Sequence, residues 1–171
     1  RDDVDLVDLA AWFLLGAEPE GARVRPLGHV AFVEVFGNGL LYSANYELLV
    51  RPWNVGARIG VSYFSTKVSD HALSHPYTLV TVPIVLDYYL GTVHHKLQLG
   101  LGATVLYTRV STDGLGLSYG TDGVAVAGTA IVGYRYFPRD RGFSFGLGFT
   151  PLLRATKGIL PWGGADVGWV F

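Results

Sequence analysis

The 171-residue sequence contains no cysteine and no methionine, and only 16% of its residues are charged. Without cysteine there is no disulfide, thiolate metal site or thiol nucleophile, which fits an oxidising compartment. Because even an initiator methionine is missing, we expect a processed or trimmed chain whose targeting peptide has been removed. The net charge of -1 and the absence of a basic run argue against a nucleic-acid partner.

Long hydrophobic runs are also missing, although half of the residues are hydrophobic and the mean hydropathy is +0.33. The run "AAWFLLGA" at 10–17 has eight residues, whereas a membrane-spanning helix needs roughly 20. The apolar residues must therefore be distributed over short strands.

Residues 1–28 differ from the rest of the chain. Four aspartates stand near the start: Asp2, Asp3, Asp5 and Asp8. Carboxylates there favour a helix N-terminus, and apolar residues follow at helical spacing. We predict a short amphipathic helix or, alternatively, a poorly ordered leader. An acidic start is wrong for a signal peptide. The chain thus divides into a leader, 1–28, and one domain, 29–171.

From residue 29 onward, apolar residues recur at every second position. Within 96–108 the odd-numbered residues are all apolar, whereas the even-numbered ones are polar or glycine, apart from Leu106. Successive side chains of a strand point to opposite faces, so one face of this strand is apolar. The same alternation predicts eight strands, at about 29–37, 40–51, 54–65, 77–90, 95–109, 123–137, 142–151 and 163–171.

The predicted connections alternate in length. Tight turns rich in Gly, Pro and Asn cover 51–54, 91–95 and 138–142. Longer loops cover 66–76, 110–122 and 152–162, and 37–39 is the one short connection on the long-loop side. This pattern is typical of a transmembrane β-barrel. We predict an all-β, eight-stranded, antiparallel up-and-down barrel in a bacterial outer membrane, with periplasmic termini and extracellular long loops.

Charged residues of the predicted strands fall on the face opposite the apolar one: Glu34, Glu47, Arg58, Asp87, Lys96, Arg135 and Asp166. Eight strands enclose an interior only wide enough for side chains, so we expect these charges to pair in a filled lumen without an open pore. A soluble lipocalin-like barrel is the main structural rival. A water-soluble barrel of this sequence would have to bury the seven charges or expose the rows of Leu, Val and Phe to water. We therefore favour a barrel whose apolar rows face lipid.

The last strand ends in an apolar comb, Val167, Trp169 and Phe171. This ending resembles the C-terminal signature by which outer-membrane barrels are recognised by the barrel-assembly machinery. Together with "GNGLLYSANYELLV", "YTLVTVPIVLDYYLG" and "PWGGADVGWVF", it is similar to small OmpA/OmpX-like barrels and to outer-membrane barrels of the Bacteroidetes type. The resemblance covers residues 29–171. It implies outer-membrane lipid and lipopolysaccharide as surroundings and a monomeric protein.

Candidate catalytic residues gather in the predicted loop 66–76: Ser69, Asp70, His71, Ser74 and His75. Such a set can supply a nucleophile, a base and an orienting carboxylate. Outer-membrane acyl hydrolases and acyltransferases acting on lipid A resemble this arrangement, but the His-x-Ser pattern of the deacylases is absent. Two histidines four residues apart lack an evident third metal ligand. We expect no metal and no cofactor.

The favoured prediction for function is a non-enzymatic barrel with a structural, membrane-integrity or surface-interaction role. The first alternative is a lipid-modifying enzyme that uses the loop 66–76. The second alternative is a narrow channel.

Overall fold

The computed structural model describes residues 27–70, 73–114, 117–154 and 158–171, and of 67–70, 73–76, 110–114, 117–121 and 154 the backbone alone. Ten strands and one short 3-10 helix, η1, make up the described chain. Their bounds are β1 Leu27–Val35, β2 Tyr42–Val50, η1 Arg51–Trp53, β3 Val55–Asp70, β4 Leu73–Gly91, β5 His95–Gly114, β6 Leu117–Tyr136, β7 Gly142–Phe149, β8 Leu152–Arg154, β9 Gly158–Leu160 and β10 Gly163–Val170.

Eight of these strands close into a ring of antiparallel neighbours. Strands β1 to β7 pair in chain order, β7 pairs with β10, and β10 closes the ring against β1. The closing register sets Val30 opposite Val170, and the Phe171 amide donates to the His29 carbonyl at 2.9 Å. The short hairpin β8–β9 lies outside the ring and pairs with β6. The predicted eight-stranded all-β barrel is therefore confirmed.

Alternating burial along the strands follows the alternating polarity of the sequence. In β1, every second residue from Gly28 to Glu34 is buried, and the residues between them are exposed. The exposed set on the barrel wall is apolar, including Leu101 at 71%, Leu147 at 68% and Val132 at 53%. A closed sheet whose outer face is apolar and whose charged side chains lie on the inner face has the inside-out arrangement of a transmembrane barrel.

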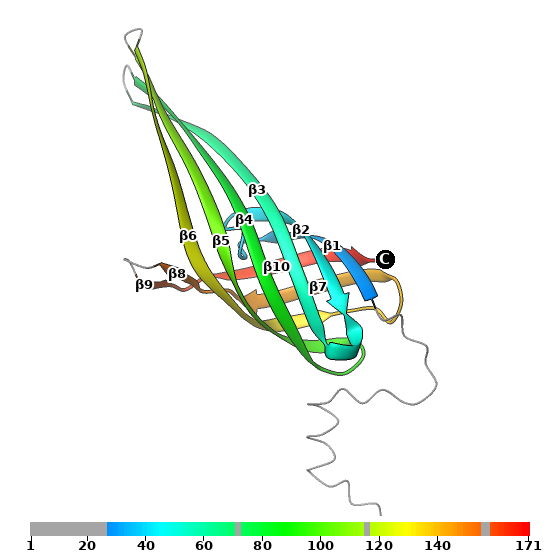
Figure 1. Cartoon of the computed structure of the whole chain (residues 1–171). Helices are drawn as coiled ribbons and strands as arrows, with labels where there is room; N and C mark the ends of the chain where they lie inside the picture. The colour runs from blue at the N-terminus through cyan, green and yellow to red at the C-terminus, as the bar shows by residue number, and fades with distance from the viewer. Residues whose placement is uncertain (1–26, 71–72, 115–116, 155–157) are drawn as a thin grey trace, which may run out of the picture.

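The strands of the ring differ greatly in length. Strands β1, β2, β7 and β10 have 8 or 9 residues, whereas β3 to β6 have 16 to 20. The four long strands continue past the rim as one curved sheet (Figure 1). We call this extension the projecting sheet, and the end of the barrel that carries it the hairpin end. The opposite end is the turn end, where 51–54, 92–94 and 137–141 connect the strands.

The predicted long loops are largely wrong. Strand β3 runs to Asp70 and β4 starts at Leu73, so most of 66–76 is a paired hairpin. Likewise β5 and β6 are paired up to Gly114 and Leu117, and 152–162 contains the hairpin β8–β9. Beyond the apolar band a strand needs backbone pairing but no apolar face. Apolar alternation therefore marks only the lower part of each long strand.

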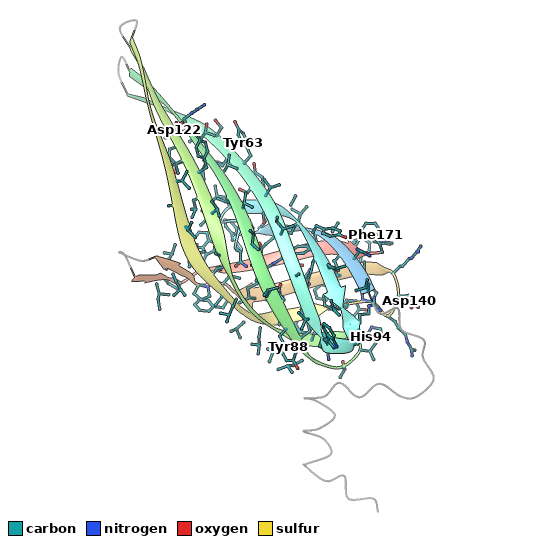
Figure 2. The ribbon with its side chains drawn as sticks, viewed as in Figure 1. Tyr63, Tyr88, His94, Asp122, Asp140 and Phe171 are labelled. Atoms are coloured by element: carbon teal, nitrogen blue, oxygen red, sulfur yellow. The ribbon has the colours of Figure 1, made fainter. Side chains whose placement is uncertain are left out.

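Aromatic rings cluster on the outer face near the turn end. Phe143 and Trp169 meet edge to face at 5.3 Å, and Tyr136 stacks on Phe145 at 5.2 Å. Figure 2 shows Tyr88, His94 and Phe171 at or near this end of the barrel, far from Asp122. Aromatic side chains favour the membrane–water interface, so these rings mark one boundary of the apolar band. The leader, predicted as 1–28, lies outside the described residues except for Leu27 and Gly28, which begin β1.

The inside-out wall predicts a strong dependence of stability on where a charge is added. Leu147→Arg places a charge on the exposed apolar wall, and should lower the free energy of unfolding in a bilayer by about 2–4 kcal/mol. Ser65→Arg, at an exposed position on the projecting sheet, should have little effect. Denaturant titrations in lipid vesicles, read by the heat-dependent gel shift, measure both. Equal tolerance of the two substitutions would contradict a lipid-facing wall.

Candidate functional site

The interior of the barrel contains a layer of charged side chains contributed by six strands. Two guanidiniums, Arg58 from β3 and Arg135 from β6, lie among four carboxylates. The carboxylates belong to Glu34, Glu47, Asp87 and Asp166. All six side chains are at most 8% exposed. Their strand positions share the inward parity, which is why residues distant in sequence meet here.

Arg135 joins β6 to β2 and β10 across the interior. Its Nη2 lies 3.7 Å from Glu47 Oε2 and 3.3 Å from Asp166 Oδ1, and its Nη1 donates to Asp166 Oδ2 at 3.3 Å. The guanidinium also lies 4.2 Å from the centroid of the Phe32 ring. A cation over an aromatic face is attracted by the ring quadrupole, so Phe32 helps to hold the arginine in place.

Arg58 joins β3 to β1 and β4 in the same layer. Its Nη1 lies 3.5 Å from Glu34 Oε1, and its Nε lies 3.6 Å from Asp87 Oδ2. Gln98 adds a hydrogen bond, donating from Nε2 to Asp87 Oδ1 at 2.8 Å. Of the seven residues predicted to form the lumen network, these two arginines and four acids lie together. Lys96 lies nearer the turn end, where its Nζ donates to Asn54 Oδ1 at 3.3 Å.

Glycines on the inner face make room for the carboxylates. Gly100 is the cross-strand partner of Asp87, and Gly146 is the partner of Asp166. A Cβ atom at either glycine would lie 2.3 Å from a carboxylate oxygen, which is closer than any real contact. The glycine-rich inward parity of the sequence is therefore a steric condition for the charged layer.

An apolar cluster fills the barrel below the charged layer, at the turn end. It comprises Val30, Phe32, Leu49, Tyr89, Phe137 and Val170, each at most 7% exposed. Tyr89 packs edge to face on Phe137 at 5.2 Å, and its hydroxyl donates to Glu47. The cluster thus seals the base and attaches it to the charged layer. The sequence analysis missed it, although all six residues share the inward parity.

Above the charged layer, the connection 36–41 between β1 and β2 folds into the barrel. We call it the plug loop. Gly37, Asn38 and Gly39 are buried, and Asn38 is 0% exposed. Positive φ angles of 61° at Phe36 and 77° at Leu40 turn the chain at its two ends. The connection predicted at 37–39 is thus short, as expected, but it spans 36–41 and folds inward, which its length did not indicate.

Three threonines from distant strands hold the plug loop. Thr81 Oγ1 donates to the Gly39 carbonyl at 3.0 Å, Thr104 Oγ1 to the Asn38 carbonyl at 2.9 Å, and Thr129 Oγ1 to Asn38 Oδ1 at 3.0 Å. From below, Glu34 Oε2 accepts from the Asn38 amide at 3.1 Å. In the sequence, these three contacts are visible only as a threonine at an inward-facing position of β4, β5 and β6. Their role could not be predicted, because only the fold brings the plug loop next to them.

The projecting sheet has two open edges among the described residues. Strand β2 pairs with β3 only as far as Val61, so the paired strand of 62–70 is β4 alone, although the Tyr42 hydroxyl of β2 donates to the Tyr63 carbonyl. Strand β6 pairs with β7 at 132–136 and with β8 at 128–129, so 117–127 is bonded on the β5 side alone. The side of this sheet that continues the barrel interior carries the half-buried Phe64, Leu79 and Leu106.

A polar cluster lies on the outer face of the projecting sheet. Arg109 Nε and Nη2 donate to the two carboxylate oxygens of Asp122 at 2.9 and 3.1 Å, and the Tyr107 hydroxyl donates to Oδ2 at 2.9 Å. Hydrogen bonds donated by Arg109, and to a smaller extent by Tyr107, hold the pKa of the Asp122 carboxyl below its usual value. Figure 2 shows Asp122 on the projecting sheet, far from the turn end.

Solved structures similar to this chain are small outer-membrane barrels. Ail, the attachment invasion locus protein of Yersinia pestis, is 12% identical with a TM-score of 0.51, over 85% of this chain and 95% of that chain. The N-terminal β-barrel domain of Pseudomonas aeruginosa OprF is 12% identical with a TM-score of 0.53, over 87% of this chain and 100% of that domain. No family model and no curated protein matches the sequence.

The fold is that of the small eight-stranded outer-membrane β-barrels. The comb resembling the C-terminal signature of such barrels lies on the outer face of β10 and just after it. Val167, Trp169 and Phe171 are 52%, 43% and 52% exposed. Asp166, between them in sequence, points into the charged layer. Among the described residues, no helix is long and apolar enough to cross a membrane.

The predicted catalytic residues fall in the hairpin between β3 and β4 of this outer-membrane barrel fold. The backbone of Ser69 pairs with that of Ser74, Asp70 with Leu73, and His75 with Val68. His71 and the side chains of the other four lie outside the described residues. Within the described part of the chain, no group of three His, Cys, Asp or Glu residues is arranged to hold a metal ion.

The charged layer predicts a large cost for removing its central cation. Arg135→Met leaves Glu47 and Asp166 buried without their guanidinium, and should lower the free energy of unfolding by about 3–5 kcal/mol. Adding Glu47→Gln and Asp166→Asn should restore part of the loss. Arg109→Met, which breaks an exposed ion pair, is the control and should have little effect. Denaturant titration in detergent micelles gives the ranking. Equal losses for the two arginines would show that the interior pairs do not stabilise the barrel.

Proposed function

We propose that this protein is a closed outer-membrane barrel that presents the projecting sheet at the cell surface to a protein partner. The observation that carries the proposal is the unequal length of the strands. Eight or nine residues per strand suffice for the apolar wall, whereas β3 to β6 continue as a sheet with two unpaired edges. A longer strand than the wall requires has no use inside a bilayer.

The chemistry of the projecting sheet favours an extended polypeptide as the partner. Unpaired N–H and C=O groups at a strand edge can pair with an added strand. Phe64, Leu79 and Leu106 offer apolar contacts beside these edges. In the proposed orientation the hairpin end is extracellular and the turn end, with both described chain ends, is periplasmic. The apolar wall then contacts outer-membrane lipid, including lipopolysaccharide, and the comb of β10 serves the barrel-assembly machinery.

The filled interior supports a role without transport. The apolar base, the charged layer and the plug loop lie one above another, and each is made of buried side chains or buried backbone. A solute would have to displace all three. We therefore propose neither a channel nor an enzyme, and treat both as outcomes that experiments can reveal.

The outer part of the projecting sheet can be removed without touching the barrel. Thr66 pairs with Tyr77 and Arg109 pairs with Asp122, so an Asn-Gly turn can replace 67–76 and another can replace 110–121. The shortened protein should still fractionate with the outer membrane and keep its heat-dependent gel shift. A photo-crosslinking residue at Ser65 should give a protein adduct in the full-length protein. The same residue at the buried Ser144 is the control and should give none.

The same strains distinguish the other roles. We expect the shortened protein to restore detergent resistance to a deletion strain and to leave the mass spectrum of lipid A unchanged. Absence of any Ser65 adduct, with resistance restored only by the full-length protein, would instead indicate a membrane-integrity role for the projecting sheet. A change in lipid A acylation that requires 66–76 would indicate the lipid-modifying enzyme.

The closed interior also predicts that the barrel does not conduct ions. The wild-type protein in planar bilayers should give no conductance steps. Asn38→Ala, which removes one contact of the plug loop, should remain silent because the charged layer and the apolar base lie beneath it. Stable steps in the wild type would support the narrow channel.

A further inference from the structure

The turn end contains a pocket that neither the barrel wall nor the proposed surface role explains. It is a small cavity that is partly open to solvent. Its floor is apolar, formed in part by Leu49, Tyr89 and Phe137, and its rim carries the cationic Arg51, Lys96 and Arg139. An apolar floor under a cationic rim suits a ligand that combines apolar side chains with carboxylates.

Hydrogen bonds from Arg51 to uncharged backbone carbonyls hold the rim in place. Arg51 Nη1 donates to the Arg139 carbonyl at 2.7 Å, and Nη2 donates to the Asp140 carbonyl at 3.4 Å. These bonds tie η1 to the connection 137–141 across the mouth. In the described part of the chain, neither Arg51 nor Arg139 forms an ion pair with a carboxylate. Asp140 is exposed on the same connection, flanked by Arg139 and Arg141, so positive charge prevails at the mouth.

The start of β1 passes beside this rim. Leu27 pairs with Val50, which lines the pocket, and a Cβ atom on Gly28 would lie 3.1 Å from Arg51 Nε. The segment that precedes β1 is therefore joined to the barrel at the mouth itself. Its sequence "DDVDLVDLAAWFLL" at 2–15 combines aspartates with Val, Leu, Trp and Phe, which is the chemistry that the pocket suits.

We propose that the acidic segment 2–8 of this chain docks in the turn-end pocket. Its aspartates meet Arg51 and Arg139 at the rim, and its Val and Leu side chains cover the apolar floor. The eighteen residues 9–26 can span about 60 Å when extended, far more than the width of an eight-stranded barrel. Because the segment is tethered at the rim, its effective concentration at the pocket is in the millimolar range. A modest affinity is therefore enough to keep it docked.

The absence of cysteine from the sequence makes a disulfide test clean. The full chain carrying Leu6→Cys and Val93→Cys, in detergent micelles under mild oxidation, should form an intramolecular disulfide. Val93 is chosen because it lines the pocket without carrying charge. Leu6→Cys with Ser65→Cys, at the hairpin end, is the matched control. We expect the pocket pair to form its disulfide about tenfold faster or more, the ratio that a differential affinity of about 1.4 kcal/mol produces.

Charge reversal separates docking from chance encounter. Arg139→Glu, or Arg51→Gln for a milder change, should slow formation of the Leu6–Val93 disulfide towards the control rate, as should 1 M salt. Replacing the four aspartates of 2–8 by lysine should restore it in the Arg139→Glu background. The heat-dependent gel shift verifies that each variant is folded. Equal rates for the pocket pair and the control, or insensitivity to charge reversal, would overturn the proposal. A disulfide between two chains instead would assign the pocket to a second copy.

Discussion

A bilayer offers no hydrogen-bonding partner to an exposed backbone, and the rest of this structure depends on that constraint. It requires the ring to close, and β10 closes it against β1 through a continuous register that ends at the last residues of the chain. Closure in turn fixes which parity faces lipid. The polar side chains of the wall strands must then fit into the interior, which is only wide enough for side chains. For this reason the ion pairs, the glycines and the plug loop lie close together.

The interior shows how that crowding is resolved from one end to the other. At the base, apolar side chains satisfy the need to fill space, and the Tyr89 hydroxyl reaches up to Glu47. In the middle, the two arginines on β3 and β6 pair with carboxylates on four other strands, β1, β2, β4 and β10. At the top, threonines on β4 and β5 donate to backbone carbonyls of the plug loop, and the threonine on β6 donates to the Asn38 side chain.

The sequence predicted well whatever depends on parity. The eight strands, the outward comb at Val167, Trp169 and Phe171 and the inward side of the seven charged residues all follow from a period of two. It predicted poorly whatever depends on distance across the barrel. Nothing local in "GNG" indicates that Asn38 reaches Thr104 and Thr129, and nothing in the polar run after Phe64 distinguishes a paired hairpin from a loop. Pairing between strands is non-local, so apolar alternation loses its value where the membrane ends.

The plug loop has a consequence for how the protein is built. It connects the first two strands of the ring, yet its partners lie on β4, β5 and β6, which follow later in the chain. Its buried Asn38 cannot be satisfied until those strands have curved round to meet it. The plug loop can therefore make its final contacts only after β4, β5 and β6 have taken their places, although it belongs to the first hairpin of the chain.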